Sequence, residues 1–164
     1  MKEKNIMILD DFLSEKELKI INDNLNKVHF NHIDSDMPNY KYGFGHRFYP
    51  DETNKWLFDK IKNKFFPDKD LKPIDCSFRL RHNAHKVLPH RDDHVNYLFL
   101  CYLKGKEIMY NGTGFYNDNQ TLDRYIGFKQ NRALFFDSHI THTDLQALGD
   151  SSPRYSLNIF YEKL

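Results

Sequence analysis

Two histidines and two aspartates lie close together in the segment VLPHRDDHVNY, which spans residues 87–97. Its alternation of apolar and polar residues predicts a β-strand, yet a strand that only built a core would carry no imidazole or carboxylate. Side chains two residues apart on a strand point to the same face, so His90 and Asp92 would project side by side. Both are ligand types for divalent metal ions, and the pair could bind one.

The chain holds three His-x-Asp triplets, so the triplet alone does not identify a metal site. His32 and Asp34 fall in the connection after a predicted helix, where polar residues need no further explanation. A third triplet begins at His142, shortly after the apolar run RALFF has ended and the chain turns. His142 could therefore reach the same cavity as His90 and Asp92.

Two imidazoles and one carboxylate on one face of an octahedron leave three coordination positions open. That donor set favours non-haem Fe(II) in enzymes that activate oxygen. A zinc ion on the same three residues could instead activate water for hydrolysis. A non-catalytic jelly-roll binding module would explain the predicted strands, but not three ligand-type residues in matching positions.

The last predicted strand, RYSLNIFY at residues 154–161, has one polar face that carries Arg154, Ser156 and Asn158. This face either lies in water or points into the interior. In the interior, the guanidinium of Arg154 and the hydroxyl of Ser156 could bind a carboxylate through charge-assisted hydrogen bonds. A zinc hydrolase would give no role to an inward-facing Arg154 and Ser156.

Two amphipathic helices are predicted before the strands. The first begins at the capping-box sequence SEKE, and its apolar residues recur at helical spacing: Leu18, Ile21, Leu25 and Val28. The second follows Asp51 and ends before Pro67, with Leu57, Ile61 and Phe65 on one face. Between them lies a Gly- and Tyr-rich loop, Asn39–Pro50. This is either an ordinary surface loop that packs its aromatic side chains inward or, in its Tyr40–Phe48 part with Tyr42 and His46, the rim of a substrate site.

From about Pro73 onward the sequence breaks into short β-like runs: IDCSFRLRH, VLPHRDDHVNY, VNYLFLCYL, GTGFYN, RYIGF, RALFF and RYSLNIFYE. Such a series after two helices predicts a mainly β (α+β) protein, a jelly roll or barrel with helices packed on one outer face. We expect a single domain over residues 1–164. Residues 1–70 would form the helices and the loop, and residues 71–164 the jelly-roll core.

The composition narrows the class of protein. A net charge of +1 gives no broad electrostatic surface for non-specific nucleic-acid binding. Cys76 and Cys101 lie in apolar-rich runs without CxxC spacing, which indicates reduced, buried thiols. With no apolar run of membrane length and no leader-like segment, we expect a soluble, cytoplasmic protein.

The chain resembles the Fe(II)- and 2-oxoglutarate-dependent dioxygenases, in particular small prolyl-hydroxylase-like members of phage and bacterial type. The likeness runs from about Phe78 to Glu162 and depends on His90-x-Asp92, His142 and Arg154-x-Ser156. The segments CYLK, GTGFYN and NRALFFDSHITHT also match. The resemblance implies a double-stranded β-helix, a cupin-like jelly roll. It also implies an oxygenase that hydroxylates a C–H bond while 2-oxoglutarate is decarboxylated to succinate and CO2.

Carried over to this sequence, the resemblance assigns Fe(II) to His90, Asp92 and His142. It assigns the far carboxylate of 2-oxoglutarate to Arg154, with Ser156 as a helper. The family spacing F-[ND]-S-x-x-x-H selects His142 over the rival ligand His139, while further histidines are expected in supporting or surface positions: His82, His85 and His94.

The sequence departs from many prolyl hydroxylases at two positions. They have a Tyr nine residues before the first ligand and a Lys on the last strand, where this chain has Arg81 and Arg154. Arg81 could contact the cosubstrate or the substrate, or form a surface ion pair. The substrate itself, whether a small molecule or a protein side chain, and the oligomeric state are not specified by the sequence.

Overall fold

The computed structural model describes residues 5–32, 44–81, 88–144 and 152–164. In chain order, these residues form β1 (Ile6–Leu9), α1 (Glu15–Leu25), β2 (Asn31–His32), β3 (Phe44–Phe48), α2 (Lys55–Phe65), β4 (Leu71–Arg81), β5 (Tyr97–Lys104), the short 3-10 helix η1 (Met109–Asn111), β6 (Thr113–Tyr116), β7 (Leu122–Ile126), β8 (Ala133–Asp137), β9 (His142–Asp144) and β10 (Arg154–Lys163).

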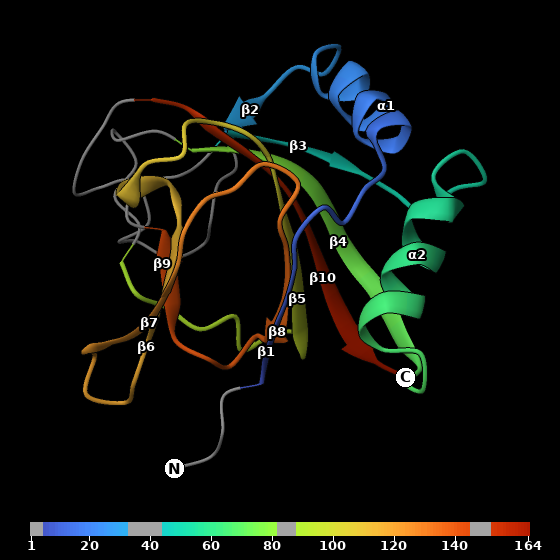
Figure 1. Ribbon diagram of the computed structural model, residues 1–164. Coiled ribbons are helices and arrows are strands. Elements are labelled where there is room, and N and C mark those ends of the chain that lie inside the picture. Colours follow the sequence, from blue (N-terminus) through green and yellow to red (C-terminus); the bar gives the residue numbers. More distant parts are fainter. Residues whose placement is uncertain (1–4, 33–43, 82–87, 145–151) are drawn as a thin grey trace.

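The strands form two antiparallel sheets that face each other (Figure 1). The major sheet has seven strands in the order β1-β8-β5-β10-β4-β3-β2, and the minor sheet has three in the order β7-β6-β9. A single bridge between His90 and His142 continues the minor sheet beyond β9. This arrangement confirms the predicted mainly β fold, a double-stranded β-helix.

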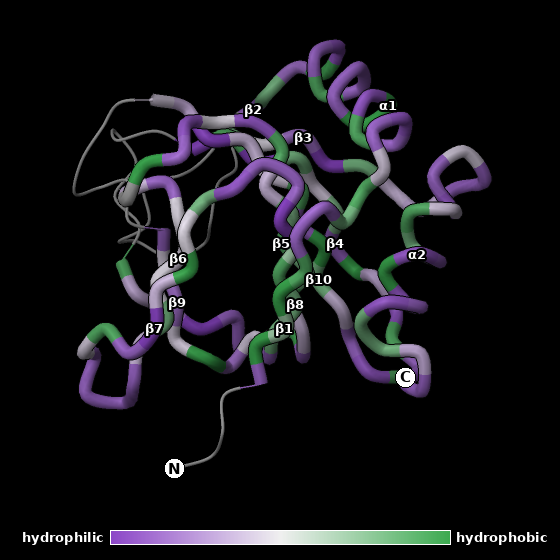
Figure 2. The backbone as a smooth tube through the Cα atoms, viewed as in Figure 1, coloured by the Kyte–Doolittle hydropathy of each residue, from purple (hydrophilic) through white to green (hydrophobic). Residues whose placement is uncertain are grey.

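Both helices cover the outer face of the major sheet, as predicted (Figure 1). Helix α1 begins at Ser14, whose backbone N–H donates to Glu17 Oε2 at 2.7 Å, so the capping box is present. The buried faces of α1 and α2 share one apolar cluster with the outward side chains of the sheet: Ile21, Leu25, Leu57, Ile61, Phe65, Phe99, Leu157 and Ile159. Hydrophobic segments accordingly follow the central strands, whereas α1 is largely hydrophilic on its exposed side (Figure 2).

A second apolar cluster fills part of the space between the two sheets, and the central strands are therefore buried on both faces. Its members come from both sheets: Leu98, Leu100, Tyr102, Phe115, Ile126, Phe128, Leu134 and Phe136. Cys76 and Cys101 are buried and unpaired, and burial raises the pKa of each thiol to about 12. The interpretation of both cysteines as core thiols is confirmed.

Three features of the fold differ from the sequence prediction. The predicted strand at 87–97 is wrong: its described residues turn instead, with the Val95 N–H donating to the Asp92 carbonyl at 3.2 Å, and β5 begins only at Tyr97. Part of the predicted loop, Phe44–Phe48, is strand β3 and pairs with β4. Strands β1 and β2 also join the major sheet, although neither was predicted. The division into residues 1–70 and 71–164 stays a prediction.

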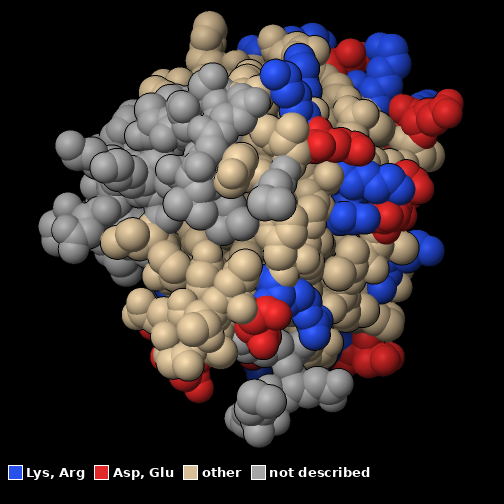
Figure 3. All heavy atoms as spheres, turned by 60° about the vertical axis from the view of Figure 1, so that its left-hand side comes forward, with Lys and Arg blue, Asp and Glu red and all other residues tan. Residues whose placement is uncertain are grey.

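No helix among the described residues is long and apolar enough to cross a membrane. On the face shown in Figure 3, the described basic and acidic side chains are intermixed. This distribution agrees with the net charge of +1.

Candidate metal centre

The three predicted metal ligands come together at one end of the space between the sheets. His90 Nε2 lies 3.8 Å from Asp92 Oδ1, and His142 Nε2 lies 3.4 Å from Asp92 Oδ2. One ligand atom from each residue falls within 4.8 Å of the other two. His142 is buried, and the other two side chains are half-buried. The three side chains are therefore close enough to bind one ion.

Backbone hydrogen bonds fix the positions of the three residues. His90 and His142 exchange both N–H···O=C bonds, at 3.0 and 2.9 Å, and the Asp92 N–H donates to the Ser138 carbonyl at 3.0 Å. The segment before β5 is therefore attached to the edge of β9 and to the turn that follows β8. Proximity in space here comes from pairing between distant segments, rather than from the alternation of one strand.

The tautomers of both histidines suit metal binding. His90 Nδ1 lies 2.9 Å from the Leu88 carbonyl and His142 Nδ1 lies 2.8 Å from the Ile140 carbonyl. Because a carbonyl oxygen only accepts, each Nδ1 carries the proton and each Nε2 keeps its lone pair. Hydrogen bonds from Nδ1 to a backbone carbonyl orient the imidazoles that bind metal ions.

The electrostatics of the three residues also suit a cation. Burial lowers the pKa of His90, and the neighbouring His142 lowers it further, so the imidazole is neutral at pH 7. Burial alone would raise the pKa of Asp92, but the interactions of the carboxylate with His142 and His90 outweigh it and lower the pKa. A neutral imidazole and an ionised carboxylate are the forms that bind metal.

The other histidines considered in the sequence lie elsewhere or outside the described residues. His139 is about half exposed, and its Nδ1 lies 3.1 Å from Asp93 Oδ1. His94 packs against the ring of Phe160, with centroids 6.1 Å apart. His46 lies opposite Phe78 on the outer face, and its Nδ1 donates to the His29 carbonyl at 3.2 Å. His82, His85 and Tyr42 are outside the described residues.

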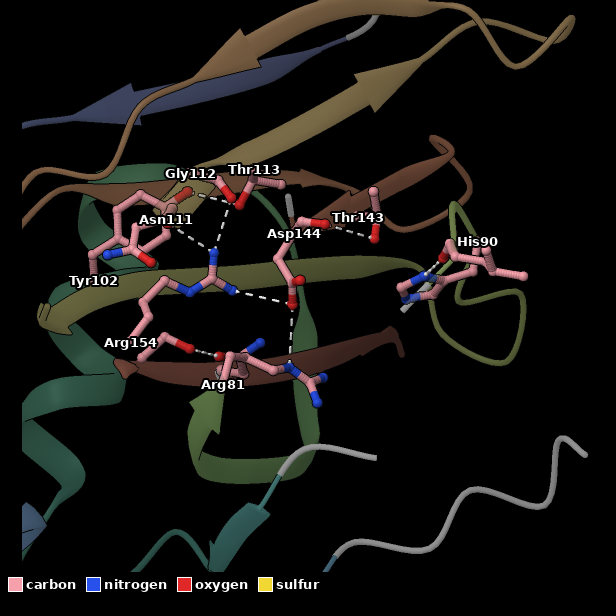
Figure 4. A network of polar contacts seen from close by, with 12 residues as sticks. Arg81, His90, Tyr102, Asn111, Gly112, Thr113, Thr143, Asp144 and Arg154 are labelled. Carbon is pink, nitrogen blue, oxygen red and sulfur yellow. Dashed lines mark hydrogen bonds and ion pairs between the residues drawn. The ribbon is translucent and has the colours of Figure 1, made fainter. Parts of the chain in front are cut away.

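Arg154 at the start of β10 points into the space between the sheets, as one of the two predicted alternatives required (Figure 4). Its side chain is only 4% exposed. Nη1 donates to the carbonyls of Asn111 and Gly112, both at 2.9 Å, and the guanidinium lies over the Tyr102 ring, 5.4 Å from its centroid. A Cβ at Gly112 would lie 2.4 Å from the Ile126 carbonyl oxygen, so only glycine allows this close approach.

Arg154 shares a buried carboxylate with Arg81, for which the sequence left a contact with the cosubstrate or substrate and a surface ion pair as alternatives. Asp144 Oδ2 lies 3.4 Å from Arg81 Nε and 3.7 Å from Arg154 Nη2, and Asp144 is 5% exposed (Figure 4). Both distances exceed those of ordinary hydrogen bonds. Among the described residues, Asp144 Oδ1 and Arg154 Nε are buried without a hydrogen-bond partner. Two guanidiniums thus share one carboxylate, so the group formed by Arg81, Arg154 and Asp144 carries a net charge of +1.

Ser156 and Asn158 continue the polar face of β10 toward the interior. Ser156 is 1% exposed, and its Oγ donates to Asn158 Oδ1 at 2.7 Å. That bond uses the only proton of the hydroxyl group. The predicted role of Ser156 at a cosubstrate carboxylate therefore requires the hydroxyl to rotate away from Asn158.

Comparison with known proteins identifies the fold. A 2OG-Fe(II) oxygenase family oxidoreductase from Burkholderia pseudomallei superposes with a TM-score of 0.73 at 11% identity, covering 96% of this chain and 85% of that one. The double-stranded β-helix of this chain is the fold of 2-oxoglutarate-dependent oxygenases.

Two further solved structures share this oxygenase fold. A Pseudomonas putida prolyl-4-hydroxylase gives a TM-score of 0.69 at 12% identity, over 99% of this chain and 94% of that one. HygX from Streptomyces hygroscopicus, with nickel, 2-oxoglutarate and hygromycin B bound, gives 0.72 at 12% identity, over 98% and 83%. Neither the protein-family models nor the curated protein sequences give a match. The predicted resemblance is thus confirmed in the fold.

Three acidic or basic residues around this centre were not predicted from the sequence. Asp144 belonged to a visible His-x-Asp triplet and was not given a role. Asp75 and Arg79 lie on the inner face of β4 and interact with each other at 3.6 Å. Polar residues at alternate positions of a strand also occur on solvent-facing strands, so only the pairing of β4 with β10 and β3 reveals that this face points inward.

Proposed function

We propose that this protein is an Fe(II)- and 2-oxoglutarate-dependent oxygenase that hydroxylates a C–H bond. The observation that carries the proposal is the combination of two features between the same two sheets. One is a His-Asp-His cluster with ligand atoms within 4.8 Å, and the other is the buried guanidinium of Arg154. A hydrolytic zinc site would need the cluster alone. An oxygenase needs both, because its cosubstrate is a dicarboxylate.

In this proposal His90, Asp92 and His142 hold the iron, a donor set suited to Fe(II) with open coordination positions. The bound iron would supply oxygen activation, with 2-oxoglutarate decarboxylated to succinate and CO2. The protein supplies orientation and a dry environment. The rings of Phe136 and Phe115, with centroids 5.0 and 6.3 Å from that of His142, exclude water on one side of the ligand.

Arg154 would bind the far carboxylate of 2-oxoglutarate, assisted by Arg81 and, after rotation of its hydroxyl, by Ser156. The net charge of +1 on the group of Arg81, Arg154 and Asp144 supports this assignment, because a buried charge is stable only when it is paired. The backbone carbonyls of Asn111 and Gly112 hold Arg154 in place before the cosubstrate arrives. We also propose that residues 1–164 form one domain. We propose a cytoplasmic location as well, which the unpaired thiols of Cys76 and Cys101 support.

The test measures succinate released from 2-oxoglutarate by the purified chain, with and without Fe(II). Calorimetric titration of 2-oxoglutarate into the metal-loaded chain is measured alongside. We expect Fe(II)-dependent succinate release and saturable binding. Absence of 2-oxoglutarate binding to the metal-loaded protein would overturn the proposal.

A further inference from the structure

A second group of two arginines and one aspartate lies on the same inner face of the major sheet. Asp75 Oδ2 lies 3.6 Å from Arg79 Nη2, and Asp75 Oδ1 lies 3.6 Å from Arg47 Nε. It repeats the composition of the Arg81–Asp144–Arg154 group, with two guanidiniums for one carboxylate. We call Arg47 and Arg79, together with the Asp75 that they share, the outer arginine pair.

The sheet register places the outer arginine pair beside the proposed cosubstrate site. Arg81 lies opposite Arg154 on β10, and Arg79, two residues earlier on β4, lies opposite Ser156. On the other side of β4, Gly45 lies opposite Arg79 and Arg47 opposite Ser77. A residue without a side chain thus stands next to Arg79 on β3.

The four arginines of this row differ in exposure. The side chain of Arg154 is 4% exposed, those of Arg79 and Arg81 are 12% and 20% exposed, and that of Arg47 is 60% exposed. Arg79 and Arg81 both interact electrostatically with the carboxylate of Asp92, so both lie near the metal ligands. Arg47 therefore reaches solvent, whereas Arg79 is mostly buried and lies near the metal ligands.

Arg79 is held in an environment that favours an incoming anion. Burial lowers its pKa to about 10, and the like charges of Arg81 and Arg47 contribute. It stays protonated at neutral pH, and its Nε donates to Ser77 Oγ at 2.7 Å, which fixes the guanidinium. Asp75 balances only one of the two positive charges, and at 3.6 Å neither contact is a bidentate hydrogen bond.

We propose that the molecule oxidised by this protein carries a carboxylate that binds between Arg47 and Arg79. This inference rests on the proposed oxygenase function and names the substrate class. The net charge of +1 in the outer arginine pair matches a monoanion, and guanidinium groups bind carboxylates in a planar, two-bond geometry. Binding there would hold the substrate at its acidic end, near the metal ligands.

The test follows the arginine Nε–Hε signals by NMR in the full chain loaded with Zn²⁺, which is diamagnetic. Addition of 2-oxoglutarate should shift the Arg154 signal, and this reports on the proposed function. Subsequent addition of propionate should shift the Arg79 signal in a saturable manner, whereas propionamide should not. The two signals separate failure of the oxygenase proposal from failure of the substrate inference.

Variants complete the experiment. Arg79→Gln should weaken propionate binding roughly tenfold or more, the value of a charged hydrogen bond. Arg47→Gln changes an exposed side chain of the same site, so it should weaken propionate binding without disturbing the fold. Arg124→Gln, at an exposed arginine of β7, is the matched control and should change nothing. Two results would overturn the inference: an Arg79 signal that propionate leaves unmoved, or a stronger response to inorganic phosphate than to propionate.

Discussion

The two faces of strand β10 are both buried, but they differ in what covers them. On the outer face, Leu157 and Ile159 are fully buried beneath the helices in an apolar cluster. On the inner face, Arg154 and Ser156 are almost equally buried, yet they are polar, and Arg154 Nε has no hydrogen-bond partner among the described residues. Burial of the first kind stabilises the fold, whereas burial of the second kind costs stability unless a ligand completes it.

This difference predicts that inner-face variants change ligand binding and outer-face variants change stability. The largest effect is expected at the metal ligands, which lie at one end of the space between the two sheets. Asp92→Ala removes the anionic ligand between two imidazoles, so we expect Fe(II)-dependent succinate release to fall at least a hundredfold, roughly 3 kcal/mol. The melting temperature without metal should change little. Unchanged turnover would remove Asp92 from the centre.

Arg154→Met should have the next largest effect, on cosubstrate affinity. It leaves the incoming carboxylate without its buried partner, a loss of about 3–5 kcal/mol. The 2-oxoglutarate concentration at half-maximal rate should rise roughly a hundredfold or more. Arg124→Met, at an exposed arginine, is the control. If the titration of the Arg154 variant matched that of the control, another group would hold the carboxylate.

Ile159→Ala tests the opposite face of the same strand. This side chain is fully buried, and its truncation should lower the free energy of unfolding by about 2–5 kcal/mol. The melting temperature should fall by at least about 5 °C, as measured by calorimetry. The half-saturating concentration of 2-oxoglutarate should stay the same. A large change in that concentration, with stability preserved, would contradict the division of roles between the faces.

Asp144→Asn should have the smallest effect and the opposite sign on affinity. It removes the carboxylate that occupies the two guanidiniums before the cosubstrate arrives. We expect 2-oxoglutarate to bind at least about fivefold more tightly, on the order of 1 kcal/mol. The ligand-free protein should melt at a lower temperature, because two buried cations lose their shared anion. Weaker binding would instead show that Asp144 serves mainly to orient the arginines.

Much of the fold could be predicted from periodicity and capping. The helices follow from the capping box at Ser14 and from apolar residues spaced for one buried face, and the long strands follow from their apolar runs. The short strands β1, β2 and β9 carry too few residues for a period to show, and their pairing partners are distant in sequence. Tertiary pairing decides such elements.

The three ligand-type residues could be predicted from their chemistry, but the geometric reason was wrong for one pair. His90 and Asp92 do not share a strand face, because the polar segment turns before β5. The alternation rule applies instead to His142 and Asp144, which share a face of β9. There one side chain lies at the metal ligands and the other at the arginines. Which polar strand face points inward depends on sheet order, which the sequence does not specify.

The reciprocal backbone bonds between His90 and His142 connect the integrity of the metal centre to the edge of a sheet. Fraying of this edge would separate two ligands in a single step, so ion release and strand opening become one event. Occupation by a cation should, in turn, slow amide-hydrogen exchange at both positions equally. The lifetime of the metal centre would then depend on the stability of this two-residue backbone bridge rather than on the strength of any individual coordinate bond.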